Sequence, residues 1–246
     1  MLLDYDGSHY HGFQRQKNSP ATVQEEMEKA LAAVTGEHIT VYGASRTDAG
    51  VHALGQVIAF DTQSSIPPEK FWLAVNTKLN PSLQSYFSEA VTYDFHPRFH
   101  AVKKHYTYLL YNRVKGASLW RDRAWCMPVK LSLAAMQASC PYLLGSHDFK
   151  AFCSSGSQVK SDFVRTVSHC SISALSGDLI RFDIMADGFL YNMVRIIVGT
   201  LVDIGKGRIA ADALPDIIAS RQRVLAGPTA PAWGLYLVQV FYPPNR

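Results

Sequence analysis

The sequence predicts an α+β protein made of two ferredoxin-like halves, each with the order β-α-β-β-α-β. Strand-like and helix-like periodicities alternate in this order twice along the 246 residues, and Gly or Pro residues punctuate the periodic segments. We expect residues 1–100 and 101–246 to form the halves, joined into one broad, mostly antiparallel sheet with helices on one face and a central cleft. The two halves should form one catalytic unit.

The first half should begin with a strand at Leu2–Tyr5 and continue with a helix at Gln24–Val34, which Gly36 ends. The apolar residues on one face of this helix are Val23, Met27, Ala30, Leu31 and Val34. The remaining elements expected in this half are strands at Ile39–Tyr42 and Val57–Phe60, a helix at Glu69–Leu79 between two Pro-containing segments, and a strand at Ser85–Val91.

The second half repeats the order, and its irregular stretch at Gly145–Asp162 is the longest in the chain. The elements expected here are a Tyr- and Leu-rich strand at His105–Asn112, a helix at Ser132–Leu144, a hairpin of Val164–Ala174 with Leu179–Met185, helices at Leu190–Ile204 and Asp212–Ser220, and a closing strand at Leu235–Phe241.

Composition limits the class of protein. The formal net charge is +4 and the apolar fraction is 48%, which fits a globular chain with a sizeable core. No apolar run approaches the ~20 residues of a spanning helix, and the N-terminus does not resemble a signal peptide. The four cysteines form no Cys-x-x-Cys pair, so we expect idle thiols in a reducing, cytoplasmic compartment.

The segment Arg46–Leu54 is the most informative part of the sequence. It joins two expected strands and is longer than the usual hairpin loop of two to five residues. Asp48 is the first candidate for catalysis, because a carboxylate can act as nucleophile, base or electrostatic partner. Arg46 could hold Asp48 ionised. The alternative is a turn in which Asp48 only caps the backbone.

Two further residues are candidates for the same site. Arg195 should lie roughly 120° from the apolar stripe of its helix, on a side shared with Asn192 and Gly199, where it could face a cleft or simply solvent. Tyr106 shares a strand face with Tyr108. Such a pair usually packs in a core, but a tyrosine facing a cleft could stack on a base or relay a proton.

Basic residues gather near aromatic ones around Arg98, Lys103 and Lys104. Interleaved cations and rings suit a polyanion that carries stackable bases, although solvated strand faces with core tyrosines would look the same. Nucleotide-binding glycine motifs and the Gly-x-Ser-x-Gly motif are absent from the sequence. The histidines are scattered, so we expect no metal site and no cofactor.

Taken together, these residues resemble the TruA-type tRNA pseudouridine synthase family over nearly the whole chain. The most specific match is Gly43–Ala53, which contains Arg-Thr-Asp-Ala-Gly. Weaker matches follow in the family's order, at Asp4–Gly7, Gly12–Gln16, Asp94–Phe99, Asp187–Gly199 and Gly234–Leu237.

The resemblance implies that Asp48 is the catalytic aspartate and that Arg195 pairs with it. It implies that Tyr106 contacts the target uracil, that Arg46 assists flipping of the target nucleotide, and that Leu237 also lies in the substrate site. It further implies a homodimer without cofactor or metal. The expected reaction is isomerisation of uridine to pseudouridine in the anticodon stem-loop of tRNA, near positions 38 to 40. A non-catalytic RNA-binding protein and a carboxylate enzyme acting on a small molecule remain as alternatives.

Overall fold

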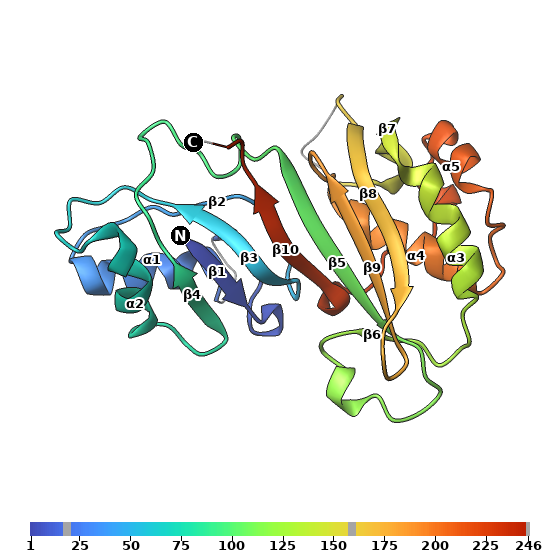
Figure 1. Cartoon of the computed structure of the whole chain (residues 1–246), viewed down its shortest axis with the longest axis horizontal. Helices are drawn as coiled ribbons and strands as arrows, with labels where there is room; N and C mark the ends of the chain where they lie inside the picture. The colour runs from blue at the N-terminus through green and yellow to red at the C-terminus, as the bar shows by residue number, and fades with distance from the viewer. Residues whose placement is uncertain (17–20, 157–160, 245–246) are drawn as a thin grey trace. The chain divides into compact units, whose positions relative to one another are not determined.

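The computed structural model describes residues 1–16, 21–156 and 161–244, and these form two compact units (Figure 1). Unit 1 comprises Met1–Val102 and Tyr236–Arg246, and unit 2 comprises Lys103–Leu235. Each unit combines helices with a mostly antiparallel sheet, so the predicted α+β class is confirmed. The catalytic unity of the two predicted halves remains a prediction.

The sheet of unit 1 has the strand order β4-β1-β3-β10. Its strands are β1 (Leu2–Tyr5), β2 (Tyr42–Gly43), β3 (His52–Ala59), β4 (Leu83–Phe87) and β10 (Leu235–Phe241). Strand β1 is antiparallel to both β3 and β4, and the short β2 is antiparallel to β3. The last strand was predicted as part of residues 101–246, but Tyr236 and Leu237 pair in parallel with His52 and Ala53. This long-range pairing places the end of the chain in unit 1.

Two helices, α1 (Val23–Thr35) and α2 (Phe71–Asn76), pack against each other in unit 1. Helix α1 begins where the side chain of Thr22 accepts a hydrogen bond from the Glu25 amide and ends at Gly36, whose φ is +76°. Four of the five residues predicted for its apolar face are buried, namely Val23, Met27, Ala30 and Leu31. The predicted helix and the face that it buries are therefore confirmed.

The sheet of unit 2 has the order β5-β9-β8-β7, with β6 parallel to β5. Its strands are β5 (Lys103–Tyr111), β6 (Trp125–Cys126), β7 (Gly145–Asp148), β8 (Val164–Ala174) and β9 (Leu179–Ala186). The predicted β8–β9 hairpin is present. Strand β7 was not predicted, because its polar residues show no alternation and lie in the stretch assigned as irregular. Residues 157–160 of that stretch lie outside the described residues.

Three helices complete unit 2. They are α3 (Leu133–Ser139), α4 (Met193–Gly205) and α5 (Leu214–Ser220). Helix α3 packs on α4 and β8, and the chain tightens into a 3₁₀ turn at Cys140–Leu143, where Pro141 cannot continue the α-helical hydrogen bonding. Helix α4 is buried on nearly all sides. Among the described residues, no helix has both the length and the apolar composition needed to span a bilayer.

Candidate active site

Asp48 lies on the segment 44–51, which joins β2 to β3 in unit 1. This loop is shorter than predicted, because β3 begins at His52 and pairs with β1 as far as Ala53. His52, Ala53 and Leu54 are therefore strand residues. Asp48 is half-buried and Arg46 is exposed. The loop therefore carries a half-buried carboxylate and an exposed guanidinium only two positions apart in the sequence.

Thr47 anchors the loop to the core of unit 1. Its hydroxyl lies 2.7 Å from the hydroxyl of Tyr5, and both side chains are buried. Burial raises the pKa of Tyr5 to about 12, so the phenol stays protonated at neutral pH. Because the side chain of Thr47 is directed into the core, the loop is fixed between Arg46 and Asp48.

Gln56 of β3 fixes the start of the same loop. Its side-chain nitrogen donates to the carbonyl of Ser45 at 2.7 Å and to the hydroxyl of Tyr5 at 3.3 Å, and its oxygen accepts from the Ser45 amide at 3.1 Å. Gln56 is fully buried. The buried side-chain amide of Gln56 thus pairs with both the backbone N–H and the backbone C=O of Ser45. It makes the hydrogen bonds that a neighbouring strand would otherwise make.

The backbone on both sides of Asp48 is also held. The Phe13 amide donates to the Thr47 carbonyl at 3.0 Å, and the Val51 amide donates to the Asp48 carbonyl at 3.1 Å. The second bond closes a turn in which Gly50 has a φ of +80°, a value that favours glycine. The carboxylate of Asp48 is thus carried by a backbone whose position is set before any substrate arrives.

His52 is buried at the start of β3, and its ring stacks on Tyr236 with the ring centroids 4.6 Å apart. Its Nδ1 accepts a hydrogen bond from the Gly7 amide at 3.1 Å and lies 3.2 Å from a carboxylate oxygen of Asp6. These contacts tie β3 to the turn after β1. His52, which lies within the segment Arg46–Leu54, therefore has a clear structural role.

Arg98 lies in unit 1 with Arg46, although 52 positions separate them in the sequence. Partial burial and the nearby positive charge of Arg46 lower the pKa of Arg98. The proximity of two guanidinium groups favours an anionic ligand. Leu237, also in unit 1, is fully buried in β10 beside Ala53.

Arg195 lies in the first turn of α4 and is half-buried. Its Nε donates to the Ala230 carbonyl and its Nη1 donates to the side-chain oxygen of Asn192, both at 2.7 Å. The chain around Pro228 packs closely on this helix at Gly199, where a Cβ would meet the Pro228 carbonyl at 1.7 Å. The predicted orientation of Arg195 toward a cleft stays a prediction.

Tyr106 lies in β5 opposite Ile184 of β9 and is buried, with its ring edge-on to Phe189 at 5.2 Å. Tyr108 on the same strand face is a core residue whose hydroxyl donates to the Pro231 carbonyl at 2.8 Å. Lys103 and Lys104 are half-buried at the start of β5. Within the described ranges, no group of three or more His, Cys, Asp or Glu side chains could hold a metal ion.

Tyr5, Thr47 and Gln56 were not predicted as site residues. Thr47 and Tyr5 lie in the segments that carry the family resemblance, but their types alone indicate an ordinary strand and loop. The hydrogen bonds that unite them join residues 42 and 51 positions apart. Only the pairing of β1 with β3 brings them together.

Comparison with known proteins identifies the family. Residues 1–100 and 140–243 match the family described as tRNA pseudouridine synthase. The chain belongs to this family. It is also 50% identical to tRNA pseudouridine synthase A of Syntrophomonas wolfei subsp. wolfei, over 99% of this chain and 96% of the relative. The enzyme of the same name from Acetivibrio thermocellus is 49% identical over 98% of both chains.

As a tRNA pseudouridine synthase, the chain is an isomerase. Both alternatives to this activity, a non-catalytic RNA-binding protein and an enzyme acting on a small molecule, are thereby set aside. The predicted family is confirmed over nearly the whole length of the chain.

Proposed function

We propose that the chain converts uridine to pseudouridine in the anticodon stem-loop of tRNA, near positions 38 to 40, with Asp48 as the catalytic residue. The observation that carries this proposal is the fixed backbone around a half-buried carboxylate. A rigid loop holds a reactive group in productive geometry and lowers the entropic part of the barrier. The sequence match of Gly43–Ala53 to the family's catalytic loop supports the same residue.

The reaction rearranges bonds within one nucleotide. The bond between N1 of uracil and C1′ of ribose breaks, the base turns, and C5 bonds to C1′. The proton on C5 is lost and N1 gains a proton, so atoms and electrons balance without an added group. The Asp48 carboxylate acts toward the sugar as nucleophile or base, or toward the ring as nucleophile.

A uracil stacked in an RNA loop can neither turn nor be reached, so the target nucleotide is flipped out. We assign Arg46 to this step because its exposed guanidinium lies two residues from Asp48. Tyr106 is assigned to the face or edge of the extruded uracil. Its contact with Phe189 holds the ring at a fixed angle, and stacking on a base is worth ~1–3 kcal/mol.

Arg195 is assigned as the electrostatic partner of Asp48. Hydrogen bonds to Asn192 and to the Ala230 carbonyl orient its guanidinium, and a guanidinium beside a carboxylate keeps the carboxylate ionised. We assign Leu237 to the apolar packing of the substrate site. Lys103, Lys104 and Arg98 are assigned to phosphate contacts, which give salt-dependent binding.

We further propose that the chain works in the cytoplasm as a homodimer. The enzyme must grip the body of a tRNA and present Asp48 to one of its loops. A second subunit would extend the surface available for phosphate contacts, and recognition would rest on RNA shape more than on base edges.

Release of tritium from tRNA labelled at C5 of uridine tests the catalytic assignment. Asp48→Asn keeps the size of the side chain and removes its charge, so we expect the rate to fall at least ~10³-fold, a barrier increase of about 4 kcal/mol. The matched control is Asp61→Asn, because Asp61 is an exposed aspartate of the same unit and should keep full activity. Full activity in Asp48→Asn would falsify the assignment.

Mapping pseudouridine in the product tRNA tests the proposed positions. We expect the modified residues at positions 38 to 40 and an unmodified tRNA body. Product elsewhere would contradict the anticodon stem-loop as the target.

Sedimentation of the free protein and of its tRNA complex tests the dimer.

A further inference from the structure

Unit 1 carries three neighbouring rings, those of Tyr42, His96 and Phe99, which we call the aromatic ledge. The ring centroids of Tyr42 and His96 lie 5.6 Å apart, and those of His96 and Phe99 lie 4.3 Å apart. Phe99 is 73% exposed and Tyr42 is 47% exposed. Single exposed apolar residues are common on protein surfaces, but a contiguous row of rings indicates a binding surface.

The chain around Phe99 is held in one conformation. The amides of Arg98 and Phe99 both donate to Nδ1 of His96, at 3.1 and 3.4 Å. The His100 amide donates to the carbonyl of His96 at 3.1 Å. These bonds close a tight turn that leaves Phe99 exposed, so its ring is presented without a further loss of backbone entropy.

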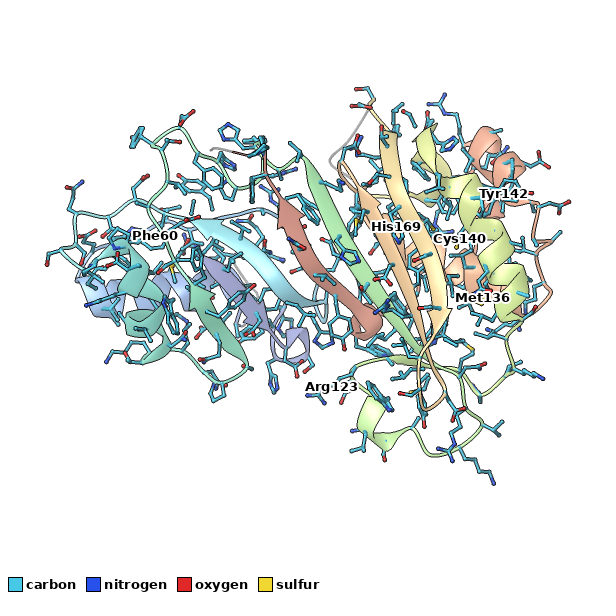
Figure 2. The ribbon with its side chains drawn as sticks, in the orientation of Figure 1. Phe60, Arg123, Met136, Cys140, Tyr142 and His169 are labelled. Atoms are coloured by element: carbon cyan, nitrogen blue, oxygen red, sulfur yellow. The ribbon has the colours of Figure 1, made fainter. Side chains whose placement is uncertain are left out.

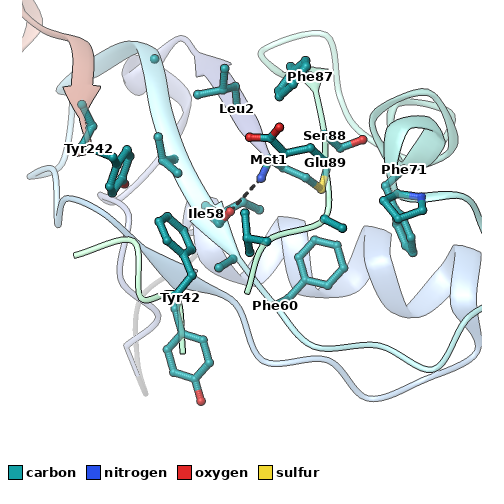
Figure 3. A pocket seen from close by; sticks show the side chains of 18 of the residues that line it. Met1, Leu2, Tyr42, Ile58, Phe60, Phe71, Phe87, Ser88, Glu89 and Tyr242 are labelled. Atoms are coloured by element: carbon teal, nitrogen blue, oxygen red, sulfur yellow. Dashed lines mark hydrogen bonds between the residues drawn. The ribbon is translucent and has the colours of Figure 1, made fainter. Parts of the chain in front are cut away.

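A second anchor fixes the turn to the sheet. The Tyr242 hydroxyl donates to the Pro97 carbonyl at 2.7 Å, and its ring packs on Phe95 at 5.1 Å. Figure 3 shows Tyr42 and Tyr242 among the residues that line a neighbouring pocket of about 820 Å³. The ledge is therefore part of a rigid surface.

Charge around the ledge favours an anionic partner. The guanidinium of Arg98 lies 5.8 Å from the centre of the Phe99 ring. Residues 94–100 contain one arginine and two histidines beside a single carboxylate, that of Asp94. The positive charge of Arg46 is close enough to act on Arg98. An aromatic row edged by guanidinium groups suits a nucleotide, whose base stacks and whose phosphate is attracted.

The ledge is also close to the catalytic loop. Tyr42 lies in β2, which leads directly into the segment 44–51, and it is six positions before Asp48 in the sequence. A chain of this length spans at most ~20 Å. A tRNA held at Asp48 thus has neighbouring nucleotides within reach of the ledge.

We propose that the aromatic ledge is a stacking site for an unpaired base of the tRNA next to the target uridine, with Arg98 contacting its phosphate. This inference rests on the proposed function, because it requires tRNA at the Asp48 loop. The base would lie against Phe99, and the rings of His96 and Tyr42 would support Phe99 from behind. Stacking of this kind tolerates any base, since every base has a π face.

Fluorescence of tRNA with 2-aminopurine next to the target uridine tests the proposal in the full-length protein. Stacking quenches 2-aminopurine, so we expect quenching with the unaltered chain and its loss with Phe99→Ala. Affinity for tRNA should fall roughly 5- to 150-fold, which corresponds to about 1–3 kcal/mol. Phe99→Trp should restore both signals.

The salt dependence of tRNA binding distinguishes the contribution of the Phe99 ring from that of the Arg98 charge. Phe99→Ala should leave the slope of log Kd against log salt unchanged, whereas Arg98→Gln should reduce it by about one phosphate contact. Unchanged quenching and affinity in Phe99→Ala would overturn the proposal. So would a loss of dimer mass in Phe99→Ala with unchanged quenching, since the ledge would then contact protein.

The readout does not depend on turnover. If Asp48→Asn retains full activity while Phe99→Ala loses quenching, the catalytic assignment is wrong and the stacking proposal is supported. If Asp48→Asn is inactive and Phe99→Ala keeps quenching and affinity, the stacking proposal is wrong and the catalytic assignment is supported.

Discussion

The hydroxyl groups of Tyr5 and Thr47 lie 2.7 Å apart inside unit 1, between the first strand and the loop of Asp48. Thr47 directly precedes Asp48, so this contact sets the position of the proposed catalytic residue. Figure 2 draws the side chains of both units. The buried pair of Tyr5 and Thr47 joins the Asp48 loop directly to the core of unit 1.

Tyr5→Phe should loosen the loop. The change removes the hydrogen bond to Thr47 and the acceptor for Gln56. We expect a stability loss of about 1–2 kcal/mol and a several-fold lower kcat, measured by thermal unfolding and tritium release. Tyr10→Phe is the control, because its hydroxyl pairs with Ser82 at 2.8 Å instead. Equal losses of kcat in both variants would contradict the role given to Tyr5.

Gly12→Ala should damage the same loop from the other side. Gly12 has a φ of +88°, and a Cβ there would meet the Thr47 carbonyl at 2.9 Å. The matched control is Gly36→Ala. Gly36 has a similar φ of +76°, but a Cβ there would meet nothing within 4 Å. Both variants should lose about 1 kcal/mol from backbone strain, but only Gly12→Ala should also lose activity. Wild-type turnover in Gly12→Ala would show that the loop tolerates displacement.

Asn192→Gly should separate positioning from stability. Asn192 has a φ of +61°, and its side chain donates to Ser154 and accepts from Arg195. Glycine relieves the backbone but removes both bonds, so unfolding should change little while kcat falls. Asp178→Gly relieves a similar φ of +66° in the β8–β9 turn and should leave kcat unchanged. A wild-type kcat in Asn192→Gly would argue against an orienting role.

Asp183 should contribute to the acid stability of unit 2. Burial alone would raise its pKa, but hydrogen bonds from His105 and Thr107 and the charge of Arg181 outweigh it, so the pKa lies below 3.8. A lowered folded-state pKa stabilises the fold above pH 3.8 and loses this effect as pH falls through the folded-state value. The stability difference between wild type and Asp183→Asn, measured by urea unfolding, should therefore be largest at neutral pH and shrink below pH 3.8.

Lys103→Glu combined with Lys104→Glu should weaken tRNA binding and flatten its salt dependence. Each lost phosphate contact reduces the slope of log K against log salt by about 0.7–0.9. Lys70→Glu with Lys78→Glu is the matched control, since both lysines are exposed beside α2. A slope unchanged from wild type would place Lys103 and Lys104 outside the RNA interface.

The residue pattern alone was enough to predict the elements whose apolar residues recur at a regular spacing. Helix α1 and the β8–β9 hairpin have the predicted positions, because the apolar residues of an element repeat with its period. The family was also determined, because the loop around Asp48 carries unusual residues in a fixed order. The apolar stripe predicted for α4, which includes Met193, Val194, Ile197, Val198 and Leu201, is buried for the same reason.

Contacts between segments that are distant in the chain could not be predicted from the residue pattern. Four features of this kind join residues far apart in the chain. They are the pairing of β10 with β3, the close packing of Pro228 on α4 at Gly199, the proximity of Arg98 to Arg46, and the hydrogen bonds that Tyr5 makes with Thr47 and Gln56. Periodicity records whether a side chain faces inward but not which partner it meets there. The residues that hold Asp48 in place therefore come together only through the pairing of β1 with β3.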